Sequence, residues 1–224
     1  MSGILYIVAT PIGNLEDITL RAIRILKEVD LIACEDTRHT GKLLAHLQVK
    51  KRMISYFEHN KMSRGVEIIR ELEEGRNVAL VSDAGTPGVS DPGFNLVVSA
   101  IDKGISVVPI PGPSAAIAAL SAAGLPTDQF HFVGFLPQKE GKKRKLLESL
   151  KGDSGTLVFY ESPFRIRKTI QFAHEIFGNR PVAAVHELTK IHEGIFRGNL
   201  SELEGLIEKV PEKGEWLLLI GRTP

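Results

Sequence analysis

Short apolar runs alternate with amphipathic segments along the first half of the chain. The runs are rich in β-branched residues and bounded by turn residues, as is typical of strands covered on both faces, and they lie at 4–10, 31–34, 53–57, 78–82 and 105–110. Helices are expected between them, over 18–28, 39–47, 61–74 and 93–103. In the third helix, Val66, Ile69 and Leu72 recur at helical spacing and predict one buried stripe. The alternation predicts an α/β domain with a mainly parallel sheet.

The pattern changes after residue 124. Pro126 and the polar residues around it predict a linker. Five further strands are expected beyond it, at 130–136, 156–162, 181–188, 193–200 and 215–221. Some of these strands have little sequence between them, and strands joined so closely are usually antiparallel. We therefore expect two α/β domains, residues 1–124 with a mainly parallel sheet and residues 125–224 with a mixed sheet.

Composition is that of an ordinary globular protein. Hydrophobic residues make up 43% of the 224 positions and charged residues 25%, so the chain can bury a sizeable core. With 28 Lys and Arg against 27 Asp and Glu, any contact with nucleic acid would need a local basic patch. The single cysteine, Cys34, allows no internal disulfide and fits a reducing compartment. Because no signal-peptide pattern and no run of eighteen apolar residues is found, we expect a cytoplasmic location.

The segment "VSDAGTPGVSDPG" (81–93) follows a predicted strand and is rich in glycine and proline. A turn of this kind, at the carboxyl end of a parallel strand, is where open α/β sheets bind ligands, and glycine lets the backbone approach the ligand closely. Neither the dinucleotide fingerprint nor the P-loop pattern occurs, which disfavours a dinucleotide or a triphosphate. The alternative is a tight turn whose Ser90 or Asp91 caps the next helix.

Other loops share this position after a predicted strand of the first sheet, namely "ATPIGNLEDIT" (9–19), "CEDTRHT" (34–40) and "PIPGPSA" (109–115). Further characteristic segments follow in "GFLPQKEGKKRKLLESL" (134–150), "FYESPFRI" (159–166) and "HELTKIHEG" (186–194). In this order the set resembles the tetrapyrrole methylase superfamily, and specifically its ribosomal RNA small subunit methyltransferase I branch. The resemblance covers nearly the whole chain. It implies a homodimeric enzyme that methylates the 2'-hydroxyl of a cytidine in 16S ribosomal RNA, with S-adenosylmethionine in a cleft between the two domains.

The resemblance also assigns cofactor contacts, motif by motif. They are Pro11, Asp83, Gly85, Val89, Ser90, Ser114 and Ala115 in the first-half motifs, and Tyr160 and Leu188 in the second domain. Where tetrapyrrole-modifying relatives tend to have an aspartate before the proline of the glycine-rich loop, this chain has Thr86, which favours the ribosomal branch. Backbone groups with a carboxylate suit S-adenosylmethionine, because this cofactor carries no phosphate.

A ribose hydroxyl reacts poorly until a base draws off its proton. The candidate bases are Glu35, Asp36 and His39 in one loop, and Glu187 and Lys190 in "HELTK". The two carboxylates of "CEDTRHT" are our first choice because they end a predicted strand at the crevice. Capping of the loop and an ion pair with Arg38 are the alternative role for them. Lys190 would act as a base only with a lowered pKa.

Metal and thiol chemistry fit the sequence poorly. His186 and His192 are six residues apart, not four as in a zinc-protease helix, so no metal is expected. Cys34 ends an apolar strand beside an anion, an environment that raises the pKa of a thiol, and is expected in the core.

Basic residues that could bind RNA phosphates cluster in the second domain. They are Lys139, Lys142, Lys143, Arg144, Lys145, Arg165, Arg167 and Lys168. Arg38 and His39, nearer the crevice, would position the target ribose. The alternative for the lysines is a solvated start of a helix.

Two other functions compete with this interpretation. A methyltransferase for a small molecule such as a corrinoid precursor would not need the basic loop. A non-catalytic ribosome-binding factor would not need intact cofactor loops, which this chain retains.

Overall fold

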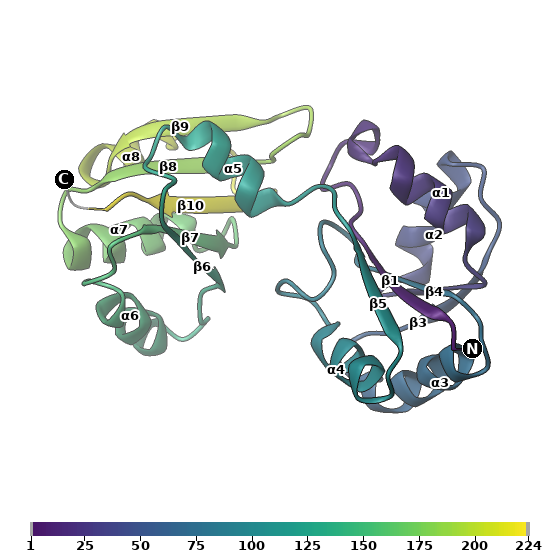
Figure 1. Cartoon of the computed structure of the whole chain (residues 1–224). Helices are drawn as coiled ribbons and strands as arrows, with labels where there is room; N and C mark the ends of the chain where they lie inside the picture. The colour runs from purple at the N-terminus through teal and green to yellow at the C-terminus, as the bar shows by residue number, and fades with distance from the viewer. Residues whose placement is uncertain (1, 223–224) are drawn as a thin grey trace. The chain divides into compact units, whose positions relative to one another are not determined.

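The chain forms two compact α/β units, Met1–Ser114 and Ala115–Pro224, and the computed structural model describes residues 2–222 (Figure 1). This confirms the predicted fold class of two α/β domains. The boundary lies ten residues before the expected one, because helix α5 (Ala115–Ala123) belongs to the second unit. None of the helices among the described residues is long and apolar enough to cross a membrane.

The first unit is built on a parallel sheet of five strands. They are β1 (Ile4–Val8), β2 (Leu31–Cys34), β3 (Arg52–Ser55), β4 (Val78–Val81) and β5 (Ser106–Ile110), in the order β3-β2-β4-β1-β5. Every residue of β2 and β4 is buried, as expected of apolar runs with helices on both faces. The mainly parallel first sheet is confirmed.

Helices cover both faces of this sheet (Figure 1). The turn η1 (Leu15–Asp17) precedes α1 (Leu20–Glu28), and α2 (Thr37–His46), α3 (Lys61–Glu73) and α4 (Phe94–Asp102) follow. One cluster of buried residues joins α1 and α2 to the sheet, and a separate cluster joins α3 and α4 to it.

The buried stripe predicted for α3 is wrong at one position. Val66 is 72% exposed, whereas Ile68, Ile69 and Leu72 are buried. The three buried residues face both the sheet and α4, and Val66 lies on the outer side of the helix.

The second unit contains the predicted mixed sheet. Its strands are β6 (Phe130–Phe135), β7 (Thr156–Glu161), β8 (Pro181–His186), β9 (Gly194–Asn199) and β10 (Trp216–Ile220), in the order β6-β7-β10-β8-β9. Strand β6 pairs with β7 in parallel, and the other neighbouring strands are antiparallel.

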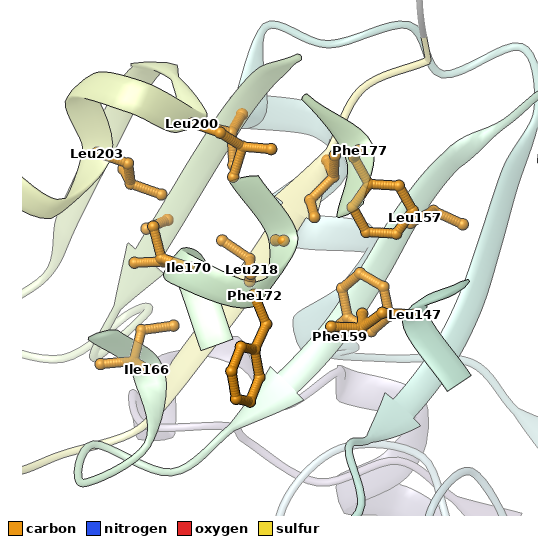
Figure 2. Packing of buried hydrophobic residues seen from close by; sticks show 14 of the residues in the cluster. Leu147, Leu157, Phe159, Ile166, Ile170, Phe172, Phe177, Leu200, Leu203 and Leu218 are labelled. Atoms are coloured by element: carbon orange, nitrogen blue, oxygen red, sulfur yellow. The ribbon is translucent and has the colours of Figure 1, made fainter. Parts of the chain in front are cut away.

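Alternate side chains of this sheet enter two different cores. On one face, Phe159 and Leu218 pack beneath α6 (Glu140–Ser149), α7 (Ile166–Phe177) and α8 (Leu200–Leu206), as Figure 2 shows. On the other face, Leu217 and Leu219 pack with α5. Small side chains of α5 such as Ala116 and Ala119 let the helix approach the sheet closely, which is why it belongs to the second unit.

A buried charge network corrects the assignment of Lys143 to RNA binding. Lys143 is only 2% exposed; its Nζ lies 2.8 Å from Oε2 of Glu161 and 2.6 Å from Oγ1 of Thr169. Arg165 pairs with the other oxygen of Glu161, with 2.7 Å between Nη2 and Oε1. Lys143 therefore neutralises a buried carboxylate and is not available to a phosphate. Although Lys143 belongs to a basic run in the sequence, it lies on the buried side of α6, and this position gives it a structural role.

Replacing Lys143 with methionine is expected to destabilise the second unit. Removing one partner of a buried ion pair leaves a charge poorly compensated, and we expect a loss of about 3 kcal/mol in the free energy of unfolding. Urea unfolding followed by fluorescence of Trp216, the single tryptophan, measures the loss in this unit. Lys142→Met is the matched control, because Lys142 is exposed, and should change stability by less than about 0.5 kcal/mol. Equal stability of the two variants would contradict the assignment.

Candidate functional site

The carboxyl edge of the first sheet has a switch point between β2 and β4. These strands are neighbours, but β2 continues through α2 to β3 on one side, and β4 continues through α4 to β5 on the other. Connections that leave in opposite directions open a crevice where α/β sheets bind ligands. Cys34 pairs with Val81 in register, so Glu35 and Ser82 begin adjacent loops at this crevice.

The glycine-rich loop is tied to the loop after β1 by its backbone. The amide of Thr10 donates to the carbonyl of Gly85 at 2.9 Å, and the amide of Gly85 donates back at 3.0 Å. Gly85 holds a φ of +82°, which glycine adopts without strain. Oγ1 of Thr86 donates to the carbonyl of Pro113 at 3.4 Å, which joins the loop after β5. The loops that hold Pro11, Asp83, Gly85 and Ser114 are thus brought together.

The far part of the glycine-rich loop is bare and strained. Nothing lies within 4 Å of the place where Gly88 would carry a Cβ, and Val89 is 45% exposed. Ser90 has a φ of +64°, which residues other than glycine seldom adopt. Such strained backbone is often found at ligand sites. Helix α4 is capped by Gly93 without a side-chain bond, so the capping role considered for Ser90 and Asp91 is wrong. These features leave the loop open to a ligand.

The two carboxyl groups proposed as bases differ in their surroundings. Asp36 caps α2, since its Oδ1 accepts from the amide of Arg38 at 2.8 Å, and its Oδ2 accepts from Nη2 of Arg38 at 2.7 Å. The Arg38 hydrogen bonds hold the pKa of Asp36 well below its usual range. The alternative role of capping and ion pairing is therefore confirmed for Asp36, which makes it a weak base.

Glu35 is the carboxyl suited to proton transfer. Burial raises the pKa of Glu35, and the charges of Asp83 and Asp36 raise it further. Among the described residues no hydrogen-bond or ion-pair partner holds this carboxylate. It is therefore available to accept a proton.

Asp91 is a feature of the site that sequence reasoning considered only as a cap. Burial, followed by the charge of Glu35, raises the pKa of Asp91 to about 6, and a hydrogen bond with Ser82 opposes this. Asp83 links the two loops by accepting from the amide of Asp36 at 3.2 Å. The loops after β2 and β4 thus present Glu35, Asp83 and Asp91 near one another. The sequence shows Asp91 just after the glycines of this loop, but it does not reveal that the carboxyl group is buried.

Arg38 and His39 lie exposed in the first turn of α2, beside this edge. Cys34 is buried in the core, where burial raises the pKa of its thiol, as predicted. Within residues 2–222, no three His, Cys, Asp or Glu side chains are arranged to hold a metal ion.

The sites predicted in the second unit also gather on one side of its sheet. One buried cluster, formed by α5 and the sheet, contacts all three of them: Ala115, Tyr160 and Leu188. The rings of Phe132 and Phe135 lie 5.1 and 5.2 Å from that of Tyr160, measured between centroids. Contact of one cofactor molecule with residues of both units stays a prediction.

The loop that contains Leu188 is strained, and Lys190 in it is paired. Glu187 and Thr189 have φ angles of +49° and +66°, and among the described residues Oγ1 of Thr189 is buried without a hydrogen-bond partner. Burial alone would lower the pKa of Lys190, but hydrogen bonds to Glu187 at 2.8 Å and Glu215 at 3.0 Å raise it overall. These hydrogen bonds favour the protonated form of Lys190, so this arrangement does not favour it as a base, and its catalytic role stays a prediction.

The residues predicted to bind RNA fall into two groups. Arg144 pairs with Glu175, and Arg165 with the buried Glu161, so both are engaged within the unit. Lys142 is exposed and has no ion-pair partner in the part of the chain that the structure describes. Free cations therefore remain at the start of α6.

Comparison with known proteins agrees with these features. Residues 4–204 match the family model for Tetrapyrrole (Corrin/Porphyrin) Methylases. Among curated proteins, the Ribosomal RNA small subunit methyltransferase I of Halalkalibacterium halodurans is 53% identical over 97% of this chain and 75% of its own length. The protein of the same name from Synechocystis is 49% identical over 99% of this chain and 80% of its own length.

Solved structures show the same fold. A uroporphyrin-III-C-methyltransferase from Thermus thermophilus is similar with a TM-score of 0.68 and 26% identity, over 98% of this chain and 94% of that one. The cobalamin biosynthetic enzyme cobalt precorrin-4 methyltransferase has a TM-score of 0.69 at 20% identity, over 97% of this chain and 94% of that one. The chain therefore belongs to the tetrapyrrole methylase family and, within it, to the ribosomal RNA small subunit methyltransferase I group.

Proposed function

We propose that this protein transfers a methyl group from S-adenosylmethionine to the 2'-hydroxyl of a cytidine in 16S ribosomal RNA. The observation that carries the proposal is the similarity over 97% of the chain, at 53% identity, to a protein named as a ribosomal RNA small subunit methyltransferase. Similarity to the solved tetrapyrrole enzyme is much lower, at 26% identity, so a tetrapyrrole or corrinoid precursor is the less favoured substrate.

The chemistry of the first unit's edge suits S-adenosylmethionine. The carboxyl groups of Asp83 and Asp91 would repel a phosphate, but they suit a cofactor that carries an ammonium and a sulfonium and no phosphate. We propose that the backbone around Gly85 and Ser90 and the exposed side chain of Val89 hold it, together with Pro11 and Asp83. S-adenosylmethionine supplies an electrophilic methyl group on sulfur.

We propose that Glu35 accepts the proton of the ribose hydroxyl. Its carboxylate has the raised pKa and the free oxygens that a base needs, whereas Asp36 is held by Arg38 and Lys190 is held protonated. Proton transfer from the hydroxyl to Glu35 leaves the ribose oxygen as the nucleophile. Arg38 and His39, exposed beside Glu35, would contact the substrate strand.

The assembly and location follow from the same proposal. A substrate in the small ribosomal subunit, and a free buried cysteine, favour the cytoplasm. A homodimer is expected from the family resemblance. The exposed side chains of Met62 and Val66, which line a groove between α3 and α4, support it, because exposed apolar surface commonly marks a protein contact.

Labelled methyl should pass from S-adenosylmethionine to small ribosomal subunits that lack the modification. After alkaline hydrolysis of the RNA, the label should remain in a dinucleotide, because a methylated 2'-oxygen cannot attack the adjacent phosphate. A corrinoid precursor offered in parallel should gain no label. If neither subunits nor naked 16S RNA take up label, the proposed reaction is wrong.

Glu35→Gln is expected to lower the rate of methyl transfer by about 10²–10⁴-fold, the usual contribution of a general base, with the Kd for S-adenosylmethionine changed little. The matched control is Asp36→Asn, since asparagine caps a helix as well as aspartate does and should retain most of the activity. Single-turnover rates and isothermal titration of the cofactor separate the two effects. A larger loss in Asp36→Asn than in Glu35→Gln would assign the base to Asp36 instead.

The buried carboxyl of Asp91 should make stability depend on pH. Its pKa is raised from 3.8 to about 6 on folding, so the stability it contributes is fully present below pH 3.8 and is lost as pH rises through 6. Asp91→Asn removes this loss, and its stability relative to the parent protein should therefore increase between pH 4 and pH 7. Urea unfolding of both proteins across that range measures the difference. A constant difference would show that Asp91 titrates normally.

A further inference from the structure

Two phenylalanines are exposed at the carboxyl edge of the second sheet. Phe135, the last residue of β6, is 63% exposed, and Phe164, three residues beyond the end of β7, is 79% exposed. Neither ring belongs to a buried cluster of the second unit. Two flat apolar rings exposed at one edge of a sheet form a surface on which a flat ligand can stack.

Both rings sit on a fixed framework. Strands β6 and β7 are parallel neighbours, and Phe135 pairs in register with Tyr160, so the loops after the two strands begin side by side. Oε1 of the buried Glu161 accepts from the amide of Ser162 at 2.7 Å, and it pairs with Arg165. The loop that carries Phe164 is therefore held at both ends by one carboxylate.

Unpaired cations lie next to this edge. Three exposed lysines follow the loop after β6: Lys139 caps α6, and Lys142 and Lys145 lie in its first two turns. Within the described chain none of the three has an ion-pair partner. The start of α6 lies near that of α7, which follows Phe164, because Glu140 and Lys168 approach within 3.9 Å. We name Phe135, Phe164, Lys139, Lys142 and Lys145 the aromatic–lysine patch.

We propose that the aromatic–lysine patch binds an unpaired stretch of RNA, with bases stacked on Phe164 and Phe135 and phosphates held by the three lysines. The inference rests on the proposed function, since it assigns to the RNA substrate a site on the second unit. Single-stranded nucleic acid is commonly bound by aromatic rings with cations along the backbone path, and a base in a duplex has no free face for a ring. Phe135 also contacts Tyr160, a predicted cofactor residue.

RNA fits the patch better than a second copy of this chain does. In a two-fold symmetric dimer through this surface, the patch would face itself, and the three lysines of each copy would approach those of the other. Like charges across a contact are unfavourable, whereas a phosphate backbone neutralises them. The charge of the patch therefore points to a polyanion.

The test is the affinity for a fluorescein-labelled single-stranded 12-nucleotide RNA of mixed sequence, measured by fluorescence anisotropy. Phe164→Ala should weaken binding by about 5- to 150-fold, the range that corresponds to the roughly 1–3 kcal/mol of stacking one base. Phe164→Trp should retain the affinity, and Phe164→Leu should lose it, because leucine is apolar but has no flat face. Changing the three lysines to glutamine should reduce the slope of log K against log salt by about 2.

Phe130→Ala is the matched control. Phe130 is an exposed phenylalanine at the opposite end of β6, away from the lysines, and its removal should leave the affinity for RNA unchanged. Trp216 fluorescence and the Kd for S-adenosylmethionine, both unchanged in Phe164→Ala, would show that the fold and the cofactor site are intact.

Two results would overturn the inference. One is equal RNA affinity of Phe164→Ala and Phe130→Ala. The other is a change of oligomeric state in Phe164→Ala, seen by sedimentation, without a change in RNA affinity, which would assign the patch to a second copy. Methyl transfer by the parent protein is measured separately, so its absence would refute the proposed function and leave the RNA result to decide the patch.

Discussion

Two backbone hydrogen bonds between Thr10 and Gly85 hold the first unit's site together. They join loops that are 75 residues apart in sequence but follow adjacent strands β1 and β4. Gly85 makes them possible, because a left-handed backbone at this point turns its amide and carbonyl toward Thr10. Oγ1 of Thr10 adds a third bond, to the carbonyl of Ser82 at 3.0 Å. With the loop fixed at this point, its far part around Gly88 and Ser90 can remain open and strained for a ligand.

Environment, and not residue type, separates the acidic groups at this edge. Asp36 and Glu35 are adjacent in sequence, yet one is held by Arg38 and the other is left without a partner. Burial gives Glu35 and Asp91 raised pKa values, while hydrogen bonds give Asp36 a lowered one. One edge of the sheet therefore offers a fixed anion, Asp36, beside two carboxyls with raised pKa values, Glu35 and Asp91, which is the separation of roles that acid–base chemistry needs.

Much of the fold could be predicted because its strands are short, apolar and buried. The run at 31–34 coincides with β2, the strands of both units occur in the predicted order, and so do the four helices expected in the first unit. Errors occur where tertiary contacts decide. From sequence alone, Val66 could lie on the buried or the exposed side of α3. Packing against α4 buries Ile68 and leaves Val66 exposed. Residues 115–123 are apolar enough to pack on either sheet, so their placement in the second unit was not evident from sequence.

The candidate site was predictable to a lesser degree. The loops were identified because they share a position after parallel strands, but titration depends on burial and on partners far away in sequence. Lys143 illustrates this, since its partner Glu161 lies 18 residues further on and nothing distinguishes Lys143 from the lysine before it.

That buried network also bears on how such a sequence can diverge. Lys143, Glu161, Thr169 and Arg165 satisfy one another, so the effect of changing any one depends on which residues occupy the other three. A single replacement passes through an intermediate with a buried unpaired charge, whereas an apolar set in all positions at once can be as stable as the ion pair. Substitutions here are therefore epistatic. We therefore expect these four positions to be exchanged as a group or retained, because no one of them can change without leaving its partners unsatisfied.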